Sequence, residues 1–168
     1  MLRLVAIALA FAALIPWWRT APAAVPPRPE PPRPALPLFV FRGDDASGLP
    51  VARAALERVL ETSIGAKARE LLESGTLAGP LTIELNRRGE NFTEYRIPGR
   101  ELGETIVFDP RSRPLVETER GRERAHPETV LAHELGHAVF KLTSEQDVIE
   151  AIENPVREQM GLPRRSRF

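Results

Sequence analysis

The sequence contains no cysteine, which excludes disulfide bonds, thiolate metal sites and a cysteine nucleophile. It also has no excess charge of either sign, because 23 Lys and Arg residues balance 23 Asp and Glu residues. A nucleic-acid-binding protein needs a basic surface that neutralises phosphates, so DNA and RNA are not expected partners. Any metal ion must be held by histidine and carboxylate side chains.

No apolar run is long enough to cross a bilayer, because the run over 4–15 is short of the roughly 20 residues that a spanning helix needs. Arg3 precedes this run and the small-residue stretch 20–24 follows it, an order typical of a secretory signal peptide over 1–24. The alternative is an uncleaved membrane anchor, because two consecutive tryptophans follow the run. We therefore expect a secreted or periplasmic protein that meets a membrane only if the signal is retained.

Proline dominates residues 25–37, a composition that favours extended polyproline II and cannot build a packed core. We interpret this segment as a linker. The folded domain is then expected over 38–168, and its length allows one modest core.

Within that domain, hydrophobic periodicity predicts short strands and amphipathic helices. The stretches 86–103 and 110–126 are polar and contain Gly or Pro, so they are interpreted as loops. The pattern indicates an α+β fold with a small sheet. The predicted strands are 38–41, 81–85 and 105–109, and the predicted helices are 50–62, 66–74, 127–142 and 145–160.

The sequence His133-Glu134-Leu135-Gly136-His137 is an HExxH pattern inside a predicted helix with apolar flanks. Residues four apart share a helix face, so both imidazoles can bind one zinc ion. Glu134 can then accept a proton from a zinc-activated water and pass it to the leaving amine, which is peptide hydrolysis. The plain alternative is a surface helix that carries two histidines by chance.

A third protein ligand is expected from the helix that follows. Its glutamates are Glu145, Glu150, Glu153 and Glu158. If the two helices fold back on one another, Glu150 and Glu153 are the geometric candidates to face the two histidines. Arg157 lies four residues after Glu153, where it can orient that carboxylate or make only a surface ion pair.

Two segments resemble the zinc metallopeptidase family of bacterial type III effectors and polymorphic-toxin C-terminal domains. They are 133–138, which reads His-Glu-Leu-Gly-His-Ala, and 153–165, which begins Glu-Asn-x-x-Arg-x-Glu. Weaker similarity at 56–65 and 106–110 extends the resemblance over roughly residues 50–168.

The resemblance implies a compact zincin-like α+β domain, a zinc cofactor, a protein or peptide substrate, and Glu153 as the third ligand. The family's terminal tyrosine is replaced by Phe168, so an oxyanion donor would have to come from elsewhere, and Tyr95 is the only tyrosine. We predict a secreted zinc metalloendopeptidase with His133 and His137 as ligands and Glu134 as general base. The competing hypothesis is a catalytically weak zincin-like binding protein of the cell envelope.

Overall fold

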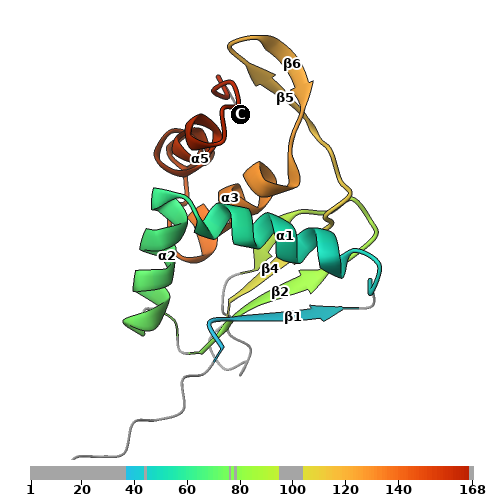
Figure 1. Ribbon diagram of the computed structural model, residues 1–168, viewed down its shortest axis with the longest axis vertical. Helices are drawn as coiled ribbons and strands as arrows, with labels where there is room; N and C mark the ends of the chain where they lie inside the picture. The colour runs from blue at the N-terminus through green and yellow to red at the C-terminus, as the bar shows by residue number, and fades with distance from the viewer. Residues whose placement is uncertain (1–36, 44, 76, 78, 95–103, 167–168) are drawn as a thin grey trace, which may run out of the picture. The chain divides into compact units, whose positions relative to one another are not determined.

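The computed structural model describes residues 37–43, 45–75, 77, 79–94 and 104–166. The predicted signal peptide and all but the last residue of the predicted linker lie outside these residues, and so do Tyr95 and Phe168. The described chain mixes helices with a small sheet, which confirms the predicted α+β class (Figure 1).

A four-stranded sheet forms one layer of the domain, in the order β1-β2-β4-β3. The strands β1 (Phe39–Gly43), β2 (Leu81–Leu85) and β4 (Thr105–Phe108) are parallel, and the short strand β3 (Phe92–Glu94) is antiparallel to β4. Alternate residues of β2 are buried, as expected for a strand with one face on the core. The predicted strands are present, but β3 lies in a stretch that was predicted to be loop.

Two helices connect β1 to β2, namely α1 (Leu49–Leu60) and α2 (Ser63–Glu73). The Thr62 side chain accepts a hydrogen bond from the amide of Gly65 at 3.1 Å, so it caps α2 at its first turn. The predicted break at residues 63–65 is therefore one turn too late. The sequence signal was misread because Thr62 was taken as the end of the first helix rather than as a cap.

The C-terminal half contains α3 (Pro127–Ala138) and a second helical segment. That segment consists of α4 (Glu145–Val148), a π-helical stretch (Ile149–Glu153) and α5 (Asn154–Gln159), where one regular helix was predicted. Pro155 follows the π-helical stretch; it has no N–H, and its ring would crowd the carbonyl four residues earlier in a regular helix. A widened turn before the proline relieves that crowding, and such turns are frequent at functional sites.

A β-hairpin lies in the stretch 110–126, which was predicted to be loop. Its strands are β5 (Leu115–Thr118) and β6 (Gly121–Arg124), and Gly121 adopts a φ of 101°, which favours glycine. The chain beyond α5 pairs with β5, because the Ser166 amide donates to the Glu117 carbonyl at 2.9 Å. The hairpin and the C-terminal segment thus stabilise one another. Sequence periodicity within either segment could not predict this pairing.

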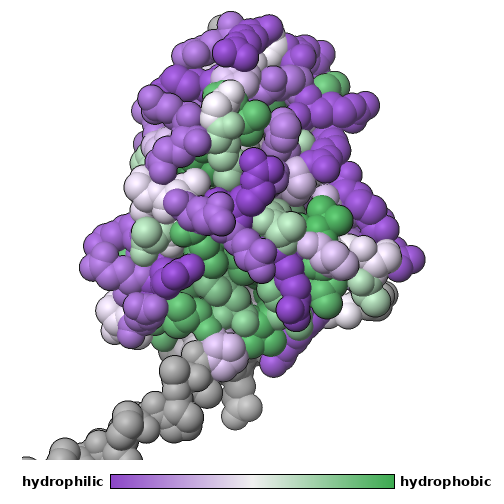
Figure 2. All heavy atoms as spheres, in the orientation of Figure 1, coloured by the Kyte–Doolittle hydropathy of each residue, from purple (hydrophilic) through white to green (hydrophobic). Residues whose placement is uncertain are grey.

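The core lies between the sheet and the helices, and α1 packs against α3 (Figure 1). In the view of Figure 2 hydrophilic residues dominate the upper part of the surface, while apolar residues gather lower, over α1, α2 and the sheet. Within the described residues, none of the helices combines the length and apolar character that crossing a membrane requires. The core includes Ala52, Val59, Leu81, Ile83, Ile106, Phe108, Leu131 and Leu135.

An ion cluster joins the loops at the carboxyl ends of the parallel strands. The side chain of Asp45 is fully buried and accepts hydrogen bonds from Ser47 at 2.8 Å and from Arg87 at 3.0 Å, and it also pairs with Arg111. Burial alone would raise the pKa of Asp45, but these bonds and one from the Gly48 amide outweigh it and lower the pKa to about 2.

We expect Asp45→Asn to lower the thermal unfolding midpoint at neutral pH and to matter less as the pH falls. Because the pKa of Asp45 is about 2 in the fold and 3.8 without its partners, its charge stabilises the fold above pH 3.8 and stops doing so as the pH falls through about 2. Circular dichroism melts of both proteins across this range measure the effect. A difference that did not change with pH would contradict the assignment.

Candidate metal centre

The HExxH segment occupies the C-terminal half of α3, where its side chains are shielded from solvent. His137 and Glu134 are buried, and the His133 side chain is 11% exposed. The helical spacing puts both imidazoles on one face, and their Nε2 atoms lie 3.3 Å apart. Two nitrogens that each bind a tetrahedral zinc at about 2.0–2.1 Å are separated by about 3.3 Å, so this pair matches a zinc site.

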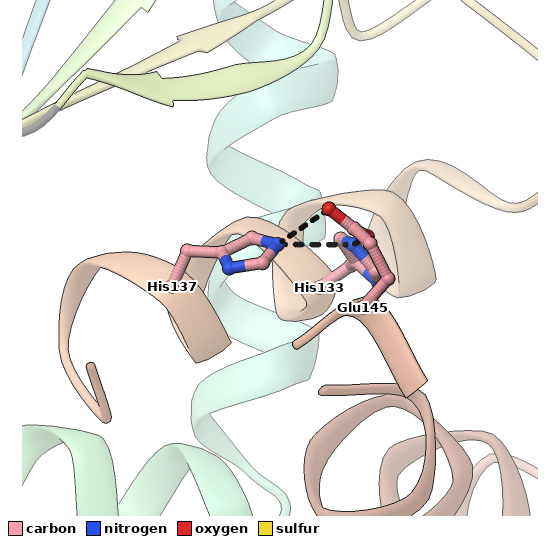
Figure 3. Close-up of side chains that lie close together, drawn as sticks. All are labelled: His133, His137 and Glu145. Carbon is pink, nitrogen blue, oxygen red and sulfur yellow. Dashed lines mark hydrogen bonds and ion pairs between the residues drawn. The ribbon is translucent and has the colours of Figure 1, made fainter. Parts of the chain in front are cut away.

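Glu145 supplies the carboxylate that completes this group. One of its oxygens lies 2.8 Å from His133 Nε2 and the other 3.5 Å from His137 Nε2 (Figure 3). The three residues offer ligand atoms that all lie within 4.8 Å of one another, a set of two nitrogens and one oxygen. Two histidines and one carboxylate are a ligand set that zinc uses at catalytic sites, where a further position stays open.

The other nitrogen of each imidazole is occupied by the protein. His137 Nδ1 lies 2.7 Å from the carbonyl oxygen of Leu142, to which it can only donate. His133 Nδ1 lies 3.2 Å from Glu153 Oε2. Partners on Nδ1 fix the ring orientation and leave Nε2 free for a metal, as in many metalloproteins.

The Glu153 carboxylate is the centre of a buried ion network, with a side chain only 2% exposed. Arg157 donates to Oε1 at 3.1 Å and Arg165 donates to Oε2 at 2.8 Å, while His133 occupies Oε2 as well. Arg157 is itself fully buried and also pairs with Glu123 of the hairpin. The network therefore links α3, the π-helical stretch, the hairpin and the C-terminal segment.

The charges of this site shift the ionisation of its members. Burial alone would lower the pKa of His133, but the hydrogen bond with Glu153 and the charges of Glu153, Glu134 and Glu145 outweigh it and raise that pKa. Burial would raise the pKa of Glu153, yet its bonds to His133 and Arg165 lower it. Both shifts favour an ionised Glu153 carboxylate beside the ring of His133.

Glu134 lines the same cavity as the two histidines and contacts the sheet. Thr93 of β3 places its hydroxyl oxygen 2.9 Å from Glu134 Oε2. Burial raises the pKa of Glu134, while Thr93 and the two histidines act to lower it. A carboxyl whose pKa is raised is a better proton acceptor than an ordinary glutamate at neutral pH.

Gly136 lets the second helical segment come close to α3. A Cβ atom at this position would lie 2.7 Å from Val148 and 3.3 Å from Ile152. The first of these distances is shorter than any contact that real Cβ atoms make. The absence of a side chain at Gly136 therefore admits the helical segment that carries Glu145 and Glu153.

A cavity of about 630 Å³ opens over these residues. Its polar part is formed by His133, His137, Glu134 and Glu145, and further walls come from β3 and from the segment that enters the hairpin. A volume of this order lies within the range of ligand-binding clefts. The Glu145 side chain is 41% exposed, so the cluster can be reached from solvent.

Comparison with protein-family models and with curated proteins finds no match. Among solved structures, the chain resembles the crystal structure of the Salmonella zinc metalloprotease effector GtgA, with a TM-score of 0.52 and 19% sequence identity. The similarity covers 74% of this chain and 73% of that one. The two proteins share a fold. At this identity the comparison establishes the architecture and leaves the activity of this chain to be argued from its own site.

The structure brings His133, His137 and Glu134 to one cavity, and it separates the glutamates that were candidates for the third ligand. Glu145 faces both Nε2 atoms, whereas Glu153 contacts Nδ1 of His133. Glu150 is exposed and bonds to Gln146 at 2.7 Å. Sequence reasoning missed Thr93, because it lies in a stretch without strand periodicity.

Proposed function

We propose that this chain is a zinc-dependent metalloendopeptidase of protein substrates, exported by its N-terminal segment. The observation that carries the proposal is the convergence of His133 Nε2, His137 Nε2 and the Glu145 carboxylate beside the buried carboxylate of Glu134, in one cavity. The shared fold with a zinc metalloprotease effector supports the reaction class.

In this proposal His133, His137 and Glu145 hold the zinc ion. When bound, zinc supplies the Lewis acidity that makes water a nucleophile near neutral pH and polarises a substrate carbonyl. Glu134 takes the proton of the attacking water and returns it to the leaving amine. Glu153 and the Leu142 carbonyl contact the Nδ1 atoms and keep the imidazoles in orientation. We therefore propose Glu145 as the third ligand in place of Glu153.

The edge strand β3 offers a place for the substrate backbone. It pairs with β4 on one side, and no other described strand pairs with its opposite side. Phe92 and Thr93 line the same cavity as the two histidines. An extended peptide that adds to such an edge would pass beside Glu134, which suits cleavage of unfolded or loop segments.

Removal and return of the metal tests this function. We expect the full chain to cleave a mixture of unfolded proteins. A strong zinc chelator should remove at least about 90% of that activity, because the metal is required for catalysis. One equivalent of Zn²⁺ should restore it. Peptide products are measured by mass spectrometry. Cleavage that survives complete removal of zinc would contradict the proposal.

A further inference from the structure

The hydroxyl group of Thr93 makes two close approaches to the residue proposed as general base. Its oxygen lies 2.9 Å from Glu134 Oε2 and 3.0 Å from the main-chain oxygen of Glu134. We propose that Thr93 is a positioning residue that holds the Glu134 carboxylate in the orientation needed to accept the proton of the attacking water. This inference rests on the proposed function and adds a residue to it.

The pairing of β3 with β4 positions Thr93 next to Glu134. Thr93 pairs with Ile106 of β4, a residue that is fully buried on the helix-facing side of the sheet. Paired residues of neighbouring strands point to the same face, so Thr93 points to α3, while Phe92 and Glu94 are exposed. The residue before the strand, Asn91, accepts a hydrogen bond from the Asp109 amide at 3.0 Å, which anchors β3 at its start.

In the contact between Thr93 and Glu134, the hydroxyl group is the donor and the carboxylate is the acceptor. A threonine hydroxyl has one hydrogen and can give it to either acceptor, and an ionised carboxylate is a stronger acceptor than a main-chain carbonyl. Glu134 has three side-chain torsions, so a bond at Oε2 removes freedom that would otherwise move the carboxylate away from the water. The bond engages Oε2 and leaves Oε1 available for the proton. The β-branched Thr93 is stiff at its first torsion, which makes it a firm anchor.

The test compares three variants of the full chain, all loaded with zinc. Thr93→Val keeps the shape and removes the hydroxyl, Thr93→Ser keeps the hydroxyl and removes the methyl group, and Thr82→Val makes the same exchange on the opposite face of the sheet. We expect Thr93→Val to lower kcat about 10- to 100-fold, the range for loss of a hydrogen bond to a charged group, with KM changed less than about 3-fold. We expect Thr93→Ser to restore kcat to within about 5-fold of the wild type.

Crystal structures of the wild type and of Thr93→Val give a readout that does not depend on turnover. The proposal predicts one Glu134 side-chain conformation in the wild type and several, or a rotated one, in Thr93→Val, with zinc content and unfolding midpoint unchanged. An unchanged kcat in Thr93→Val, an equal loss in Thr93→Ser, or an unmoved Glu134 would each overturn it. A wild type without proteolysis would instead overturn the proposed function, so the two failures are distinct.

Discussion

Glu134→Gln is expected to keep its zinc and to lose about 10²- to 10⁴-fold in kcat, the usual contribution of a general base. The amide has nearly the shape of the carboxylate and can still accept a hydrogen bond from Thr93, so the fold and the ligand cluster should persist. The amide cannot take a proton from water at neutral pH. Zinc content by atomic emission and kcat on a quenched-fluorescence peptide, measured side by side with the wild type, give the result.

A second variant separates loss of the metal from loss of the general base. His133→Ala should lose both metal and activity, because one Nε2 ligand is removed. If Glu134→Gln retained full proteolysis, the role assigned to Glu134 would be wrong. If the wild type bound zinc but cleaved nothing, the competing hypothesis of a zincin-like binding protein would account for the site better.

Glu145→Gln is expected to affect zinc binding more than stability, and Glu153→Gln is expected to cost much more stability. Glu145 faces both Nε2 atoms and its side chain is 41% exposed, so its loss should weaken zinc binding by more than about 100-fold and leave the fold nearly as stable as before. Glu153 is buried among His133, Arg157 and Arg165, so its neutralisation removes one counter-charge of the buried Arg157. We expect it to cost about 3–5 kcal/mol in stability and about 10- to 100-fold in zinc affinity.

Calorimetric titration with Zn²⁺ and urea unfolding measure the two quantities on the same samples. Glu150→Gln is the matched control, because Glu150 is exposed on the same helical segment and should change neither quantity appreciably. A larger loss of zinc affinity in Glu153→Gln than in Glu145→Gln, with the fold intact, would identify Glu153 as the ligand, as the family resemblance first suggested.

Much of the fold could be predicted because its pattern is local. Alternation at Leu81–Leu85 and the apolar stripe of α3 each indicate an element within a single segment. The strands β3, β5 and β6 were missed, because these short segments are mostly polar and form strands only through their pairing partners. The capping role of Thr62 was missed for a similar reason, since it depends on the direction of one side chain.

The candidate site also has a part that local sequence predicts and a part that it does not. His133, Glu134 and His137 are at fixed offsets on one helix, so their arrangement follows from the sequence alone. The choice between Glu145 and Glu153 depends on how the chain turns after α3 and on the π-helical stretch, which displaces every later side chain around the helix axis. Pro155 marks where the helix is interrupted, but the residue alone does not indicate which carboxylate then faces the histidines. The bond between Thr93 and Glu134 joins residues 41 positions apart and needs the sheet to be known first.

The most direct measurement is an anomalous difference map at the zinc absorption edge from a crystal of the chain grown with Zn²⁺. We predict one peak within about 2.3 Å of His133 Nε2, His137 Nε2 and a Glu145 oxygen, with Glu134 near it and not bound to it. Absence of a peak at this cluster, or a peak that Glu145 does not contact, would contradict the ligand set on which the proposed peptidase depends.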